Sequence, residues 1–305
     1  MPLTAQAQEV HDKRAASVPT DIGDSLDAKR YAFMATWREA GPEVRSVEPA
    51  TVPGPGGPIP VRIYRPEAEG TLAATICFHG GGFVFGNLDT YEPPARRWCA
   101  GAGQVVISVD YRRAPEHPFP AAVEDGIAVY AWVREHADEL GIDGGHVSVA
   151  GDSAGANIAT VTATMARDRG LPLPFVQVLL CPAVDPTWPV GPPDDLGYVR
   201  TAGDYWWPMY LPNPEDRTNP YAAPLHQSDL SGLPPALVIT AECDDLCAQG
   251  DRYAERLMEA GVPTRYKRFD GQFHVFHMFP GSIDEGAETL AMIISALTEG
   301  IGAAG

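Results

Sequence analysis

Short, mostly apolar segments alternate with longer segments of mixed character over most of the chain. The short segments are VRIY (61–64), ATICF (74–78), VVISV (105–109), HVSVA (146–150), FVQVLL (175–180), ALVIT (236–240) and TRYKRF (264–269). Each is bounded by Gly, Pro or Asp, residues that interrupt regular structure. Runs of this length are typical of strands that are buried on both faces, as in a parallel sheet.

Segments of helix length lie between several of these strands. They cover residues 121–141, 154–170, 248–261 and 282–300, and residues 1 to about 45 also have helical patterns. Strands that alternate with helices predict an α/β fold, with helices on both faces of a mostly parallel sheet. The strip TVPGPGGPIP (51–60) predicts either a domain boundary or a tight hairpin.

One long segment interrupts the alternation. Residues 185 to about 222 are rich in Pro, Asp and aromatic residues. A long insertion in a strand–helix framework is more often a lid or a binding element than a linker. We therefore expect this segment to contribute to a functional site.

The composition is that of a folded, acidic protein. Of 305 residues, 45% are hydrophobic, which allows a large core and one or two domains. The formal net charge of −18 disfavours nucleic acid and anionic membranes as partners, because phosphate groups are bound by clustered Lys and Arg. No apolar run reaches the roughly 18 residues that span a bilayer, so no membrane span is predicted.

The N-terminus and the cysteines point to the cytoplasm. The opening MPLTAQAQEVHDKRAAS contains no apolar segment of the kind found in signal peptides. The five cysteines are an odd number scattered through apolar stretches: Cys77, Cys99, Cys181, Cys243 and Cys247. This distribution is typical of reduced, buried thiols in a cytosolic protein.

GDSAG (151–155) fits the pattern G-x-S-x-G in its required context, between a predicted strand and a predicted helix. In such a sharp turn the serine is held in a strained conformation, and small neighbours let the turn close. The N-terminus of the following helix offers amide donors and the positive end of its dipole. The pattern predicts Ser153 as a nucleophile.

His79 and three consecutive glycines directly follow the strand predicted at 74–78. Glycines leave backbone amides free to approach a ligand. An HGGG loop in this position is known from the oxyanion holes of lipases and esterases. We expect His79 to anchor the loop rather than to act as a base.

A serine nucleophile needs a base, and the base needs an orienting carboxylate. With this kind of turn, the acid and the histidine follow later strands, in the order Ser, Asp or Glu, His. The last two predicted strands are followed by AECDDL (241–246) and DGQFHVFH (270–277). They hold two adjacent acids, Asp244 and Asp245, and two nearby histidines, His274 and His277. The chain order excludes the remaining histidines as the base.

Three stretches together resemble the hormone-sensitive-lipase-like esterases, in their GDSAG branch. They are HGGG (79–82), VDYRRAPEHPFPAA (109–122) and GDSAG (151–155), and the likeness runs from about residue 50 to 280. The resemblance implies an α/β-hydrolase fold with a helical cap. The catalytic core would comprise 51–185 and 222–305, and the cap would comprise 1–50 and 186–221.

The resemblance also assigns roles to residues. It implies a catalytic triad of Ser153, Asp244 and His274. It implies an oxyanion hole formed by backbone N–H groups of Gly81, Gly82 and Ala154. The family places the acid three residues after the alanine that ends its strand, here Ala241, and a glycine three residues before the histidine, here Gly271.

Four positions depart from the family pattern. Asp245 stands where proline is usual, Val275 and Ala156 replace glycines, and Arg113 replaces an apolar residue. None of them belongs to the implied triad. They bear on the shape of the pocket rather than on the chemistry.

Two further groups of residues have structural as well as functional interpretations. Arg112 and Glu116 are expected to be buried or semi-buried paired charges of a scaffold. The aromatic residues of the insertion either line an acyl or alcohol pocket or form the core of the cap. They are Tyr205, Trp206, Trp207 and Tyr210.

Together these observations predict a serine carboxylesterase that hydrolyses small-molecule esters with short acyl chains. No metal or organic cofactor is expected. Two alternatives stay open: an amidase, formamidase or peptidase with the same triad, or a non-catalytic binding protein of the same fold. The resemblance also implies a homodimer formed through an edge strand.

Overall fold

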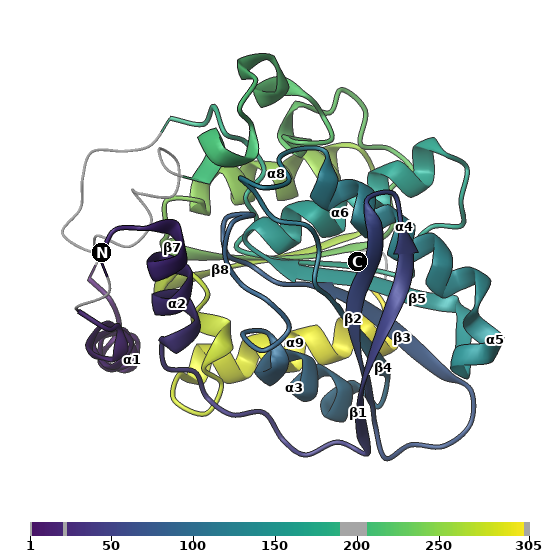
Figure 1. Ribbon diagram of the computed structural model, residues 1–305, viewed down its shortest axis with the longest axis horizontal. Coiled ribbons are helices and arrows are strands. Elements are labelled where there is room, and N and C mark those ends of the chain that lie inside the picture. The colour runs from purple at the N-terminus through teal and green to yellow at the C-terminus, as the bar shows by residue number, and fades with distance from the viewer. Residues whose placement is uncertain (1, 21–22, 190–205, 302–305) are drawn as a thin grey trace.

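The computed structural model describes residues 2–20, 23–189 and 206–301. Within them, eight strands form one sheet in the order β1-β2-β4-β3-β5-β6-β7-β8 (Figure 1). The strands are β1 (Ser46–Gly54), β2 (Gly57–Arg65), β3 (Leu72–Phe78), β4 (Val105–Val109), β5 (Ile142–Asp152), β6 (Gln177–Leu180), β7 (Ala236–Cys243) and β8 (Thr264–Phe273). β2 pairs antiparallel with β1 and β4, and all other pairs are parallel. The predicted mostly parallel sheet is confirmed.

The Pro- and Gly-rich strip at 51–60 is a hairpin rather than a domain boundary. It joins β1 to β2, with Gly54 opposite Gly57 at the turn. Gly57 has a φ of 119°, which only glycine adopts readily. The sequence patterns do not predict β1, because Pro49 and Pro53 interrupt it. β1 lies at the edge of the sheet, where prolines are tolerated, so residues 46–50 belong to the sheet rather than to a cap.

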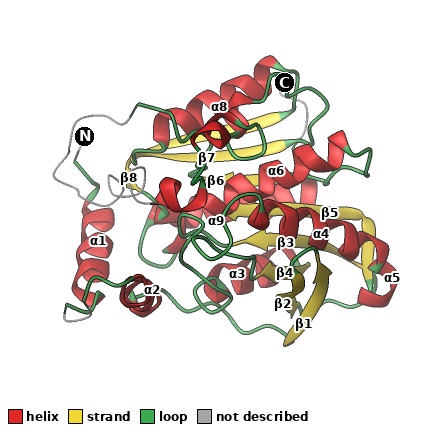
Figure 2. Cartoon of the chain, turned by 45° about the horizontal axis from the view of Figure 1, so that its top comes forward, coloured by secondary structure: helices red, strands yellow, loops and turns green. Residues whose placement is uncertain are grey.

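Helices cover both faces of the sheet (Figure 2). Among the described residues, the α-helices include α1 (Ala5–Ser17), α2 (Leu26–Ala35), α3 (Glu92–Ala102), α4 (Ala121–Glu135), α5 (Ala137–Leu140), α6 (Ala154–Asp168), α8 (Cys247–Glu259) and α9 (Asp284–Glu299). The described residues also form three short 3₁₀ helices, η1 (Pro214–Thr218), η2 (Pro224–His226) and η3 (Phe276–Met278), and residues 206–210 are helical. The four predicted internal helices are present. α3 was not predicted, and two prolines stand in its first turn, where proline fits a helix.

β3 shows how one sheet supplies two hydrophobic cores. Ile76 and Phe78 join the core beneath α4, α6 and α8. Cys77, between them, joins the opposite core with Trp98 of α3 and Leu297 of α9. Successive side chains of a strand point to opposite faces, and here both faces are buried. This explains why the strand is continuously apolar in sequence.

The two N-terminal helices lie beside the edge where the parallel strands end (Figure 1). Thr4, the N-cap of α1, donates its backbone N–H to the carbonyl of Gly271 in β8 (3.0 Å). Arg30 of α2 donates to the carbonyl of Val84, in the loop after β3 (3.0 Å). Apart from residues 46–50, which belong to the sheet, the predicted division into core and cap remains a prediction, since much of the insertion lies outside the described residues. None of the described helices combines the length and the apolar content that crossing a membrane requires.

Candidate active site

The turn between β5 and α6 holds Ser153 in a strained conformation. Its φ of 54° and ψ of −119° are costly for a residue that has a Cβ. A Cβ on Gly151 would collide with the backbone of Gly155, and one on Gly155 would collide with the backbone of Phe78. The N–H of Ser153 donates to the carbonyl of Leu180 in β6 (2.8 Å). The glycines and this bond keep Ser153 at the N-terminus of α6.

The ends of β7 and β8 bring Asp244 and His274 together. Nδ1 of His274 lies 2.7 Å from Oδ2 of Asp244, and the other carboxylate oxygen accepts the N–H of Leu246 (2.9 Å). Burial lowers the pKa of His274, but the adjacent carboxylate of Asp244 outweighs it, so that the pKa lies above its ordinary value. This is the arrangement in which a carboxylate orients an imidazole base.

The neighbouring acid and histidine, which the residues alone left open, are placed differently. Asp245 is half-exposed, whereas Asp244 is buried. His277 is buried at 6% exposure, and neither of its ring nitrogens has a hydrogen-bond partner among the described residues. The pKa of His277 is lowered to about 3, mainly by burial. The structure thus pairs the acid and the histidine that the resemblance selects.

The glycine loop after β3 presents backbone amides toward the same region. Gly81 and Gly82 have φ values of 123° and 59°, and glycine suits both. Within the described part of the chain, their N–H groups donate no hydrogen bond. The N–H of Ala154, in the first turn of α6, has no partner within the helix. These are the donors that an oxyanion hole requires.

Asp152, next to the nucleophile, fastens the glycine loop to β5. Its Oδ1 accepts the N–H of Gly80 at 3.0 Å, and the carboxylate fills the space that a Cβ on Gly80 would need. Burial raises the pKa of Asp152 to about 6, against the lowering influence of His274. Asp152 is not among the candidate site residues that the sequence patterns predict. In the sequence, Asp152 is distinguished only as an acidic residue inside the GDSAG turn. The structure shows that it lines the cavity.

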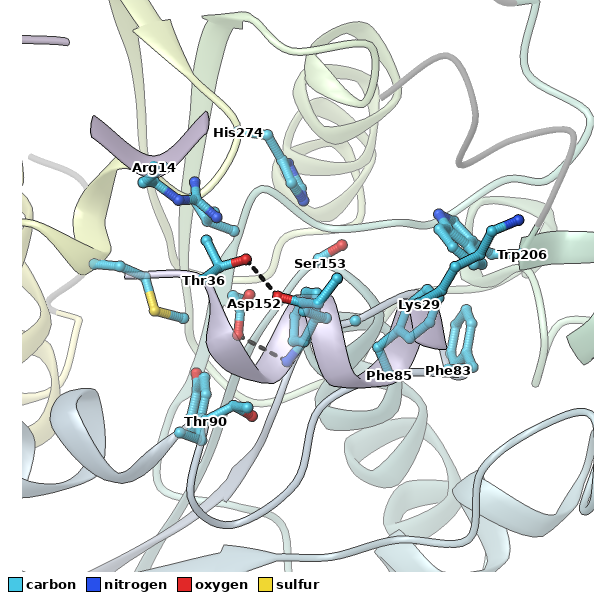
Figure 3. Close-up of a pocket in the computed structure, with 18 of the residues that line it drawn as sticks. Arg14, Lys29, Thr36, Phe83, Phe85, Thr90, Asp152, Ser153, Trp206 and His274 are labelled. Atoms are coloured by element: carbon cyan, nitrogen blue, oxygen red, sulfur yellow. Dashed lines mark hydrogen bonds between the residues drawn. The ribbon is translucent and has the colours of Figure 1, made fainter. Parts of the chain in front are cut away.

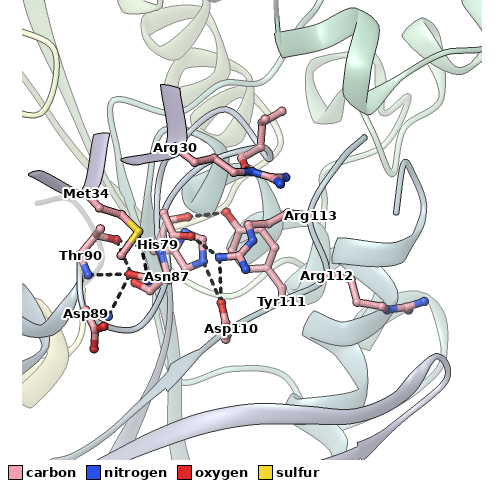
Figure 4. Close-up of polar contacts among 12 residues, drawn as sticks. Arg30, Met34, His79, Asn87, Asp89, Thr90, Asp110, Tyr111, Arg112 and Arg113 are labelled. Atoms are coloured by element: carbon pink, nitrogen blue, oxygen red, sulfur yellow. Dashed lines mark hydrogen bonds and ion pairs between the residues drawn. The ribbon is translucent and has the colours of Figure 1, made fainter. Parts of the chain in front are cut away.

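His79 is part of the scaffold of the loop (Figure 4). Its ring stacks on Tyr111 with 4.3 Å between centroids, and the Tyr111 hydroxyl donates to the His79 carbonyl (2.7 Å). Arg113, which replaces an apolar residue of the family pattern, donates to the carbonyl of Gly86 and contacts Asp110 at 3.1 Å. Burial lowers the pKa of His79 to about 3, so this imidazole stays neutral.

Arg112 and Glu116, the charges predicted to pair, form ion pairs with residues of α4 and α2. Arg112 binds the buried carboxylate of Asp125 in α4 with three contacts of 2.9–3.0 Å. Glu116 accepts two hydrogen bonds from Arg30 of α2 (2.6 and 2.7 Å). These contacts attach the stretch to α4 and α2, which is a scaffold role. Arg112 is half-buried as predicted, whereas Glu116 is exposed, because its partner Arg30 lies at the surface of α2 rather than in a core.

A cavity of about 530 Å³ joins these elements. Ser153, His274 and the three glycines of the loop line it, and Figure 3 shows His274 pointing toward Ser153. Aromatic residues form much of the remaining wall: Phe33, Phe83, Phe85, Tyr91, Trp206, Trp207 and Phe279. The volume is typical of a site for a small organic molecule.

The predicted pocket residues are placed as follows. Trp206 and Trp207 line the cavity, and a Cβ on Gly82 would lie 2.7 Å from Trp206. Tyr210 is buried and stacks on Phe83, with 3.7 Å between centroids. Tyr205 lies outside the described residues. Sequence reasoning missed the lining contributed by the N-terminal helices and the segment after them, chiefly Arg14, Lys29, Phe33 and Arg38.

Comparison with known proteins identifies the family. The sequence pattern of the α/β-hydrolase fold family matches residues 75–278, from β3 to the loop that carries His274. The chain belongs to this family. LipN of Mycobacterium tuberculosis, named a carboxylic ester hydrolase, is 40% identical over 268 residues, which are 84% of this chain and 71% of that protein.

Other α/β-hydrolases support the same placement. An ethyl acetate hydrolase of Pseudomonas putida is 36% identical over 252 residues, 80% of this chain and 79% of that protein. The solved structure of a hyperthermophilic esterase from Pyrobaculum calidifontis has a TM-score of 0.87 at 39% identity, covering 98% of this chain and 99% of that one. The resemblance to hormone-sensitive-lipase-like esterases is therefore confirmed, and the relatives of this α/β-hydrolase are carboxylic ester hydrolases.

Proposed function

We propose that the protein is a serine carboxylesterase that cleaves short-chain acyl esters, with Ser153 as nucleophile, His274 as base and Asp244 as the orienting acid. One observation carries the proposal. The 2.7 Å contact between His274 and Asp244 lies at a cavity that the strained Ser153 also lines. A nucleophile and a base at one cavity, with an acid bound to the base, are the parts that acyl transfer requires.

In the proposed acylation step, Oγ of Ser153 attacks the ester carbonyl while Nε2 of His274 takes the hydroxyl proton. Nδ1 keeps the proton that it donates to Asp244, so the imidazolium that forms is stabilised by the buried carboxylate. His274 then gives its proton to the leaving alcohol. Water repeats the sequence on the acyl-enzyme and releases the acid.

The negative charge of the tetrahedral intermediate would be stabilised by backbone amides. Gly81, Gly82 and Ala154 supply N–H groups at the glycine loop and at the start of α6. Removal of one such donor typically lowers kcat by about a hundred- to a thousandfold. Asp152 supports the arrangement because it binds the N–H of Gly80, one residue before these donors.

The size and lining of the cavity favour small acyl esters. Its volume of about 530 Å³ suits a compact molecule, and aromatic rings offer apolar contacts for an acyl chain. One relative is named an ethyl acetate hydrolase, and ethyl acetate is an ester with a short acyl group. We expect acyl chains shorter than about ten carbons to be preferred, because no apolar surface suited to a lipid interface is evident in the sequence.

The direct test is Ser153→Ala. Hydrolysis of p-nitrophenyl acetate should fall at least about a thousandfold, and covalent labelling by a fluorophosphonate should stop. Ser148→Ala is the matched control, since Ser148 is buried in β5, the strand that precedes Ser153, and its hydroxyl has no hydrogen-bond partner among the described residues. A Ser153→Ala protein that keeps its activity and still labels would show that another residue is the nucleophile.

A substrate panel separates the esterase from an amidase with the same triad. p-Nitrophenyl esters of increasing acyl length are compared with a p-nitroanilide of the same acyl group. The proposal requires faster cleavage of the ester and a decline with long chains. Preferential cleavage of the anilide would assign the site to amides.

A further inference from the structure

Cys181 is a buried thiol beside the catalytic pair, and the proposed mechanism does not use it. It directly follows β6, is 1% exposed, and has a φ of 45°, unusual for a residue with a Cβ. Its N–H donates to the carbonyl of Ile239 in β7 (2.7 Å). The backbone is therefore held between the two strands, with the thiol at the end where Asp244 follows.

Three atoms that bind metals meet at this point. Sγ of Cys181, a carboxylate oxygen of Asp244 and a ring nitrogen of His274 all lie within 4.8 Å of one another. Thiolate, imidazole and carboxylate are the three ligand types of zinc sites, at about 2.0–2.3 Å from the ion. Ligands at such distances are about 3.3–3.8 Å apart in a tetrahedral site. The 2.7 Å contact between His274 and Asp244 would therefore lengthen and wider separations would shorten, each by about 1 Å or less.

We propose that Cys181, Asp244 and His274 form an inhibitory binding site for a divalent cation of the zinc class. That the cation binds does not depend on the proposed function. That it inhibits rests on the proposed function, in which His274 is the base. A cation held by both Asp244 and His274 must take Nδ1, because Nδ1 is the nitrogen that faces the carboxylate at 2.7 Å. The ion would replace the proton between these two atoms.

Inhibition follows from the protons that move. When the ion binds Nδ1, the proton of that nitrogen transfers to Nε2, and the Cys181 thiol releases its proton to solvent. Starting from the neutral imidazole, the net change is one proton released for each cation bound. Nε2 then carries a hydrogen toward Ser153 and has no lone pair to accept the hydroxyl proton. The general base is lost while the fold stays intact.

The charge around the site favours a cation. The carboxylates of Asp244 and Asp152 both act on the His274 ring as negative charges, opposed by Arg14. The formal net charge of −18 also raises the concentration of cations near the protein. The thiolate selects zinc-class ions over magnesium or calcium, which prefer oxygen ligands.

The experiment uses Zn²⁺ on the full chain, freed of metals by chelation. Esterase activity is titrated with Zn²⁺ and then restored with EDTA, with Mg²⁺ as a parallel addition. Zn²⁺ should inhibit reversibly, and Mg²⁺ should not. Cys181→Ala should retain activity of the order of wild type and should raise the half-inhibitory Zn²⁺ concentration at least about tenfold, because one of three ligands is lost. Cys181→Ser serves if the alanine variant does not fold.

Cys247→Ala is the matched control. Its thiol lies 3.7 Å from the carboxylate of Asp251, so it is also a thiol beside an acid. This variant should be inhibited as wild type is. Equal inhibition of wild type and Cys181→Ala, or relief in Cys247→Ala alone, would overturn the assignment.

Binding is measured separately, in Ser153→Ala protein, by equilibrium dialysis against Zn²⁺ and by the thiolate charge-transfer absorption with Cd²⁺. One ion per chain and a thiolate band, both lost when Cys181→Ala is added, support the site even if Ser153 is not the nucleophile. A band that persists without Cys181 would refute the site whatever the activity shows.

Discussion

The loop 274–277, directly after β8, carries a histidine at each end, and the pKa values of the two imidazoles are shifted in opposite directions. At the first end, His274 meets the carboxylate of Asp244 at 2.7 Å, and its pKa is raised. At the other end, His277 has no hydrogen-bond partner among the described residues, and burial lowers its pKa to about 3. Burial disfavours the charged form at both ends. The difference therefore comes from the carboxylate.

The comparison shows what separates a base from a structural histidine in this protein. A base must carry a positive charge during the reaction, and the carboxylate at the first end stabilises that charge. His79, in the glycine loop, resembles His277 rather than His274, because burial also lowers its pKa to about 3. Position near the cavity is thus not enough to make a histidine a base.

The largest expected effect comes from removing each imidazole of the loop. His274→Ala should lower kcat for p-nitrophenyl acetate at least about a thousandfold, because the base is gone. His277→Ala should stay within about tenfold, because it removes a neutral group without a polar contact. Circular dichroism checks that both variants fold. Equal losses in the two variants would contradict the comparison.

The carboxylate is tested next, with the two adjacent aspartates. Asp244→Asn should lower kcat at least about a hundredfold, because an amide cannot stabilise the imidazolium and favours the wrong tautomer. Asp245→Asn should stay within about tenfold, since this side chain is half-exposed at the start of α8. The two side chains have the same chemistry and differ in burial and in the contact with His274. A reversal would mean that the acid is Asp245.

The pH dependence of kcat/KM sharpens the comparison further. The neutral imidazole accepts the serine proton, so the rate should rise with pH, with a midpoint above the ordinary histidine value of 6.5 because the pKa of His274 is raised. In Asp244→Asn the midpoint should fall, because burial remains while the carboxylate is lost. A wild-type profile that is flat across neutral pH would exclude His274 as the base.

The sequence predicted much of this site, and the reasons are local. The GDSAG turn lies between a strand and a helix, and its glycines are required by contacts that the pattern encodes. The choice of Asp244 over Asp245, and of His274 over His277, came from the family resemblance. Residue spacing alone could not decide between these candidates, because each predicted loop carries two residues of the same type close together.

Other features could not be predicted from single residues. β1 contains two prolines, and only its position at the edge of the sheet makes it a strand. The lining supplied by Arg14, Lys29 and Arg38 depends on how α1, α2 and the segment after them pack over strands far away in sequence. The meeting of Cys181 with the catalytic pair depends on the neighbouring positions of β6, β7 and β8.

The smallest expected effect is on stability in acid, where the two histidines should act with opposite sign. The pKa of His277 is about 3 in the fold, against an ordinary value of 6.5. Below pH 6.5 the unfolded chain therefore binds a proton that the folded chain does not. The free energy of unfolding should therefore fall as the pH falls from 6.5 toward 3.

His277→Gln removes that titration, so its free energy of unfolding, measured in urea, should depend less steeply on pH below 6.5 than that of wild type. His274→Gln is the matched comparison, because the pKa of His274 is raised in the fold. Between 6.5 and that raised pKa the folded protein binds the extra proton, so His274 contributes stability at low pH that is lost as the pH rises. Its removal should therefore change the slope in the opposite direction, and in a higher pH range. Slopes that changed in the same direction in both variants would show that the carboxylate does not distinguish the two ends of the loop.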